Sequence, residues 1–144
     1  MSLLNDPQQA ALADLDAAGS GLLLRYGGLL ESDIPPALRN ELARIIETRR
    51  ALLDRLARRE RSRGNLPNAA DEELNELRLL VDKLTGRVAD PAGLQARVLR
   101  AEEDWLARVE RARELAWHAD EDALLARLEY DARDATSRLQ DLRV

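Results

Sequence analysis

The sequence predicts an all-α protein, a four-helix bundle in which a long crossover containing a short helix joins two helical hairpins. Three observations predict this fold class. Apolar residues recur at spacings of three and four, Gly and Pro (7 and 5) are few among 144 residues, and no run alternates in the way an exposed strand does. A chain of this length suits one domain, so the bundle is expected to span 1–144.

Residues typical of helix ends divide the chain into segments. Asp6-Pro7 and Asp90-Pro91 each place an N-cap carboxylate before a proline suited to a first turn. Pro35-Pro36 starts a further helix, Gly64 is typical of a helix C-terminus, and a weaker break lies near Trp117. The expected helices are 7–31, 35–63, 70–85, 91–117 and 120–143.

The lengths of the connections predict how the long helices are joined. The first and last connections are brief turns, which favour antiparallel neighbours. The middle connection is about 27 residues long and contains the short segment 70–85. Two hairpins joined by one such crossover form the ferritin-like arrangement, and an irregular five-helix bundle is the simpler alternative.

Several short motifs follow one another along the chain in a defined order. They are Tyr26 before an acidic turn at Asp33, the run 47–53, the helix end 64–67, Leu84-Thr85-Gly86, the acidic run 102–104, and the closing run 137–143. In this order and spacing the chain resembles an uncharacterised family of bacterial ferritin-like proteins over nearly its whole length. The resemblance implies the ferritin-like fold and no established activity.

The ligand pattern of a ferritin-like metal site is incomplete in this sequence. Such a site takes a Glu from each of two helices and a Glu-x-x-His motif from each of the other two. Here Glu47 is followed three residues later by Arg50 and Glu129 by Ala132, and the single His, His118, lies at a helix end. We therefore expect no catalytic centre, cofactor or metal. Carboxylates for an alternative iron or manganese site are Glu47, Glu102, Glu103 and Glu129.

Two charged residues fall on the apolar stripes of the expected helices. Glu102 lies between Val98 and Trp105, and Arg49 is in phase with Leu53. A buried charge without a partner is costly, and the forked guanidinium of Arg suits a carboxylate. The sequence therefore predicts that Arg49 and Glu102 meet as a buried ion pair.

Arginines gather in the second half of the expected helix 35–63. Residues 49–63 include seven Arg against two acidic residues. These cations either are solvated and favoured by the helix dipole, or form a patch for an anion or an acidic partner. A net charge of −5 and the lack of interleaved aromatic residues argue against nucleic acid as the partner. The candidate patch consists of Arg55, Arg58, Arg59, Arg61 and Arg63.

Glycines interrupt the first expected helix. Gly19, Gly21, Gly27 and Gly28 lie within it, and each costs about 1 kcal/mol relative to Ala. Close approach of another helix and reduced rigidity are both open explanations.

These features predict a non-catalytic bundle that acts through protein–protein association, with a protein partner or as a homodimer. Leu24, Leu30 and Leu79 lie off the main stripes and are candidates for a dimer surface. The chain shows no signal peptide and no long apolar run, so a cytoplasmic protein without membrane contact is expected. The alternative is a divergent ferritin-like protein that binds iron or manganese through inward carboxylates.

Overall fold

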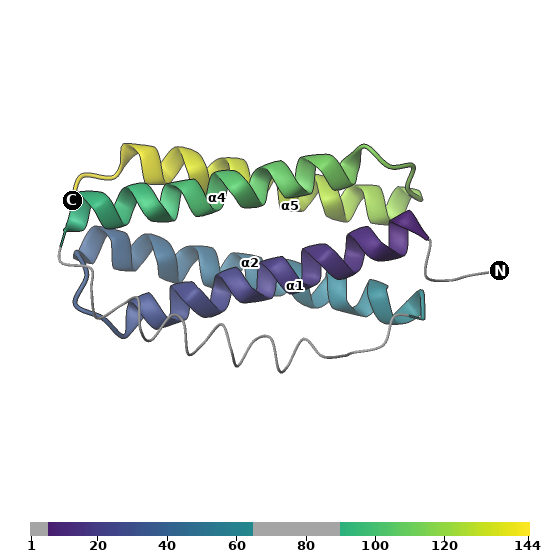
Figure 1. The fold of residues 1–144 in the computed structure, drawn as a ribbon, viewed down its shortest axis with the longest axis horizontal. Coiled ribbons are helices and arrows are strands. Elements are labelled where there is room, and N and C mark those ends of the chain that lie inside the picture. The colour runs from purple at the N-terminus through teal and green to yellow at the C-terminus, as the bar shows by residue number, and fades with distance from the viewer. Residues whose placement is uncertain (1–5, 65–89) are drawn as a thin grey trace.

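A computed structural model describes residues 6–64 and 90–144, and this part of the chain forms four α-helices without a strand (Figure 1). The helices are α1 (Pro7–Leu30), α2 (Pro36–Ser62), α4 (Pro91–Arg113) and α5 (Ala119–Asp141). The expected short helix 70–85 lies outside the described residues. Over the described residues the fold is therefore all-α, with four long helices.

The four helices pack side by side as two hairpins. Helix α1 packs on α2 and α4 on α5, and the hairpins meet through α2 with α5 and α1 with α4. Along the bundle α1 and α5 run in one direction, and α2 and α4 in the other (Figure 1). Consequently α2 ends at the opposite end of the bundle from the start of α4 (Figure 1).

Local sequence explains where the helices begin. The Asp6 carboxylate accepts hydrogen bonds from the Gln8 and Gln9 amides, and Asp90 does the same for Ala92. Helices α1, α2 and α4 each start with a proline, whose missing N–H is not needed in a first turn. The expected starts at 7 and 91 agree with the structure, and α2 begins one residue later than expected.

A glycine follows directly after the end of helix α2. Its C-cap is Arg63, and Gly64 follows with φ of +90°, a left-handed conformation that a residue without Cβ adopts at little cost. The Gly64 amide donates to the Arg61 carbonyl at 3.0 Å, which satisfies one of the oxygens that a helix end leaves without a partner.

Helix α4 ends at Arg113, four residues before the expected end at Trp117. The Leu115 amide donates to the Ala112 carbonyl at 3.2 Å, and the Trp117 indole N–H donates to the same oxygen at 2.8 Å. The indole folds back over the helix terminus and occupies an acceptor there. A side-chain contact, rather than a proline or glycine, therefore sets this boundary, and helical periodicity gives no sign of it.

Aliphatic side chains fill most of the interior, as a chain without Phe requires. Their burial along one stripe of each helix supplies the main driving force for packing. The fully buried leucines and isoleucines are Leu12, Leu15, Leu38, Leu42, Ile45, Leu56, Leu125, Leu128 and Leu139. None of the described helices combines the length and apolarity needed to cross a membrane.

Close packing explains one of the helix α1 glycines. A Cβ at Gly19 would lie 2.8 Å from Leu53 Cδ2 and 3.0 Å from Trp105 Cη2, which is too close without movement of those side chains. A Cβ at Gly27 would meet no atom within 4 Å. Gly19 therefore lets α2 and α4 side chains approach the α1 backbone, whereas Gly27 has no such role.

Alanine at these two positions is expected to shift stability in opposite directions. Gly27→Ala should raise the free energy of unfolding by up to about 1 kcal/mol, because alanine is the better helix former and space is open. Gly19→Ala should lower it by about 1–3 kcal/mol, because Leu53 and Trp105 must move. Urea unfolding measures both, and equal stabilisation by the two variants would contradict the close packing at Gly19.

Candidate functional site

Arg49 of α2 lies in the interior of the bundle with its side chain fully buried. Its Nη1 and Nη2 donate to Glu102 Oε2 and Oε1 of α4 at 2.7 and 2.6 Å. Its Nε donates to Asp131 Oδ2 of α5 at 2.9 Å. One guanidinium thus cross-links three helices, and the structure brings together the two residues that the sequence paired.

Two aromatic residues complete this cluster. The Tyr26 hydroxyl of α1 donates to Glu102 Oε2 at 2.6 Å. The Arg49 Cζ lies 5.6 Å from the centroid of the Trp105 ring, within the range of a cation–π contact. All four described helices contribute to this group, and all of its residues are buried. We call Tyr26, Arg49, Glu102, Trp105 and Asp131 the central polar cluster.

Burial and the opposed charges set the protonation of the cluster. Burial raises the pKa of Tyr26 well above its ordinary value, and the Glu102 carboxylate raises it further, so the hydroxyl keeps its proton. Burial alone would lower the pKa of Arg49, but its hydrogen bonds to Glu102 and the charges of both carboxylates raise it. Burial also raises the pKa of Asp131, although Arg49 opposes that shift. Arg49 therefore stays cationic.

Sequence reasoning missed Asp131 and Tyr26 as members of the cluster. The signal for Asp131 was present, because it lies three residues after buried Leu128 and beside buried Ala132. A second signal was the donor count of Arg49. A guanidinium has five N–H donors, and one carboxylate accepts two of them in the bidentate arrangement, so a further acceptor was required.

The structure does not bring the four candidate metal ligands together. Glu47 and Glu103 are exposed, and Glu129 is partly exposed and forms ion pairs with surface arginines. Only Glu102 reaches the interior, where Arg49 holds both of its oxygens. Within residues 6–64 and 90–144, no group of three or more His, Cys, Asp or Glu side chains is placed to hold a metal ion.

The candidate arginine patch divides into an inward and an outward part. Arg63 Nη2 donates to Glu121 Oε1 of α5 at 2.6 Å, and Arg59 Nε lies 3.5 Å from Glu121 Oε2. These two arginines therefore serve the fold and leave the patch. The members that remain exposed are Arg55, Arg58 and Arg61.

Arg63 and Glu121 form an ion pair at one end of the bundle, and we call this pair the terminal latch. The Arg63 guanidinium lies 5.7 Å from the Trp117 ring centroid, and the Gln9 side-chain amide donates to the Arg63 carbonyl at 2.8 Å. Glu121 is buried in the first turn of α5, where the helix dipole also favours a negative charge. Hydrogen bonds from Arg63 lower the pKa of Glu121.

Two of the leucines proposed as a dimer surface, Leu24 and Leu30, lie on α1. Leu24 and Leu30 are half-buried, and Leu30 packs against the core. Leu79 lies outside the described residues. The large apolar side chains exposed in residues 6–64 and 90–144 are Tyr130 and Val144.

Comparison with known proteins gives no match to any family model, curated protein or solved structure. The chemistry assigned to this chain therefore rests on the geometry of its own residues.

Removing one charged member of the central polar cluster is expected to lower the free energy of unfolding more than removing all three charged members. Arg49→Met leaves two carboxylates buried without a cation and should lower the unfolding free energy by about 3–5 kcal/mol. Adding Glu102→Met still leaves Asp131 without its donor, whereas the triple variant with Asp131→Leu should recover most of the loss. Chemical denaturation measures each step.

Arg55→Met is the matched control for this series, because Arg55 is an exposed arginine of the same helix. It should change the unfolding free energy by no more than about 0.5 kcal/mol. Full recovery in the double variant alone would show that Asp131 contributes nothing to the cluster.

The terminal latch predicts a pH-dependent contribution to stability. The folded pKa of Glu121 lies below its ordinary value of 4.5, so its contribution is fully present above that value and disappears as pH falls through the lowered pKa. The Glu121→Gln variant should therefore be less stable than the wild type at pH 7. The two proteins should be equally stable at a pH low enough to protonate Glu121 in the wild type. Unfolding curves from pH 7 to pH 3 measure this difference. A deficit that stays constant across the range would contradict the ionic latch.

Proposed function

We propose that this chain is a ferritin-like helical bundle that acts through protein–protein association and has no catalytic centre. The observation that carries the proposal is the position of the Arg49 guanidinium, which lies in the bundle interior between Glu102 and Asp131. Ferritin-like metal proteins direct carboxylates inward from facing helices to hold cations. Here a side-chain cation from the same chain neutralises the inward carboxylates, so a metal is not needed for charge balance.

The helix arrangement supports the ferritin-like part of the proposal. Two antiparallel hairpins, with α2 ending at the opposite end of the bundle from the start of α4, are what one long crossover produces (Figure 1). A simple up-down-up-down bundle would instead join α2 to α4 through a short turn at one end.

The alternative is an iron or manganese protein, and the central polar cluster argues against it. A metal would have to take Glu102 and Asp131 from Arg49, which holds them with three hydrogen bonds. The displaced guanidinium would then stay buried without acceptors, which is strongly unfavourable. No imidazole lies near enough to complete a ligand set among the described residues.

The surface supports association. Exposed charges of α2 such as Glu47, Arg50 and Asp54 have no ion-pair partner among the described residues. Exposed charges of α4 such as Arg97, Arg100 and Glu103 have none there either, whereas Arg133 and Arg138 of α5 are paired. Charged side chains that are solvated and not held by their own chain can steer and orient an incoming partner.

Two measurements on the native protein test the proposal. In extracts of cells that make the protein naturally, size-exclusion chromatography should place it in a species heavier than the 16.1 kDa chain. Elemental analysis of protein purified without chelator should find iron and manganese far below one ion per chain. Stoichiometric metal, or a 16.1 kDa species in fresh extract, would overturn the proposal.

A further inference from the structure

The outer face of α2 carries charges that alternate in sign. Glu47, Arg50, Asp54 and Arg58 are all exposed, and exposed Ala51 lies between the two central charges. We call these five residues the α2 outer stripe. None of the four charged side chains has an ion-pair partner among residues 6–64 and 90–144; Arg58 Nε donates weakly to the Asp54 carbonyl at 3.4 Å.

The missing ion pairs are informative because the spacing for them exists. Arg50 and Asp54 are four residues apart on the helix, as are Asp54 and Arg58. On α5 the same spacing does produce ion pairs, with Arg133 to Glu129 at 3.2 Å and Arg138 to Asp134 at 3.0 Å. The charges of the α2 outer stripe therefore leave one another unpaired, although their spacing would allow pairing.

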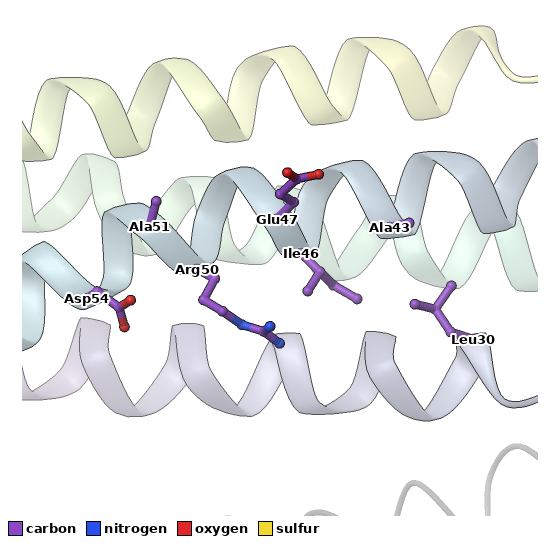
Figure 2. A pocket seen from close by; sticks show the side chains of 7 residues that line it. All are labelled: Leu30, Ala43, Ile46, Glu47, Arg50, Ala51 and Asp54. Atoms are coloured by element: carbon purple, nitrogen blue, oxygen red, sulfur yellow. The ribbon is translucent and has the colours of Figure 1, made fainter.

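The geometry of a helix places the stripe on one face. At about 100° per residue, its five side chains project within roughly 100° of one another. Figure 2 shows Glu47 and Ala51 on one side of α2, and Arg50 and Asp54 on the side toward α1. An open groove of about 390 Å³ runs beside them, and Ile46, Ala43 and Leu30 give it an apolar floor (Figure 2).

We propose that the α2 outer stripe binds the same stripe of a second copy of this chain, in an antiparallel dimer with two-fold symmetry. This inference rests on the proposed function and names its interaction surface. The charge order along α2 is negative, positive, negative, positive, and it becomes the opposite series when the helix direction is reversed. A two-fold axis level with Leu52 places Glu47 opposite Arg58 of the second copy, and Arg50 opposite its Asp54.

Symmetry strengthens this arrangement. A two-fold axis perpendicular to the helices brings each side of the stripe against the same side of the other copy, and every contact occurs twice. Four ion pairs therefore form from two kinds of contact. Ala51, next to the axis, is small enough for the helices to approach closely, and Arg61 faces the uncharged Ala43 of the second copy.

The charge balance of the stripe selects a second copy over an acidic protein. Two positive and two negative side chains make the stripe neutral, so a uniformly acidic surface would meet repulsion at Glu47 and Asp54. A strand of nucleic acid would meet the same repulsion from its phosphates. An alternating stripe in reverse orientation satisfies all four charges.

Charge reversal and mixing test the dimer. Sedimentation from about 1 µM to about 1 mM should show a wild-type monomer–dimer equilibrium that weakens as salt rises. Glu47→Arg alone and Arg58→Glu alone should each raise the dissociation constant by about tenfold or more, because like charges then oppose each other twice. An equimolar mixture of the two variants should restore dimerisation, since positions 47 and 58 are then both positive in one copy and both negative in the other.

Arg127→Glu is the matched control, because it reverses an exposed charge on α5 and should leave dimerisation unchanged. Far-ultraviolet circular dichroism should show equal helicity in every variant, since all the altered positions are exposed. A wild type that stays monomeric, charge variants that dimerise as well as the wild type, or a mixture that fails to recover would each overturn the proposal. If the purified protein stays monomeric but elutes in a heavier species from native extract, only this inference is overturned. Stoichiometric metal would overturn the proposed function instead.

Discussion

The burial of one guanidinium constrains the whole bundle. Arg49 carries a charge that cannot leave the interior and N–H donors that lose water there, so acceptors must come from the surrounding helices. Glu102 and Asp131 supply them from α4 and α5, and Tyr26 of α1 donates to the oxygen that Arg49 also uses. Sliding any helix by one turn, about 5.4 Å, would break at least one of these bonds.

The cluster therefore fixes register more than it adds stability. Three buried ionisable side chains and a phenol lose hydration free energy on folding. Their mutual attraction in a medium of low dielectric constant roughly offsets that loss. Aliphatic stripes would still pack if the helices slid or rotated slightly, because leucines are interchangeable along a seam. A forked donor between two carboxylates does not tolerate such shifts, which makes the arrangement of the four helices unique.

Helix positions and the Arg49–Glu102 pair could be predicted because both depend on local sequence. Caps, prolines and apolar phase are read within a few residues, and a charge in phase with a leucine stripe demands a partner. The end of α4 could not, because it depends on where the Trp117 side chain packs, against the Ala112 carbonyl and beside Arg63 of α2. The signal for Asp131 was present but weak, because its neighbours on the stripe, Ala132 and Ala135, have short side chains.

The difference between the inward and the outward arginines of α2 also depends on contacts in the folded structure. Arg59 and Arg63 lie toward α5, where Glu121 accepts both, whereas the outward arginines meet no acid of a neighbouring helix among the described residues. Sequence alone counts their charges equally, since it does not give the rotation of α2 relative to its neighbours. Because the interior is filled and its charges are satisfied, recognition has to take place on the surface. The alternating face of α2 is one described surface whose charges the fold itself does not use, and the proposed dimer would satisfy them.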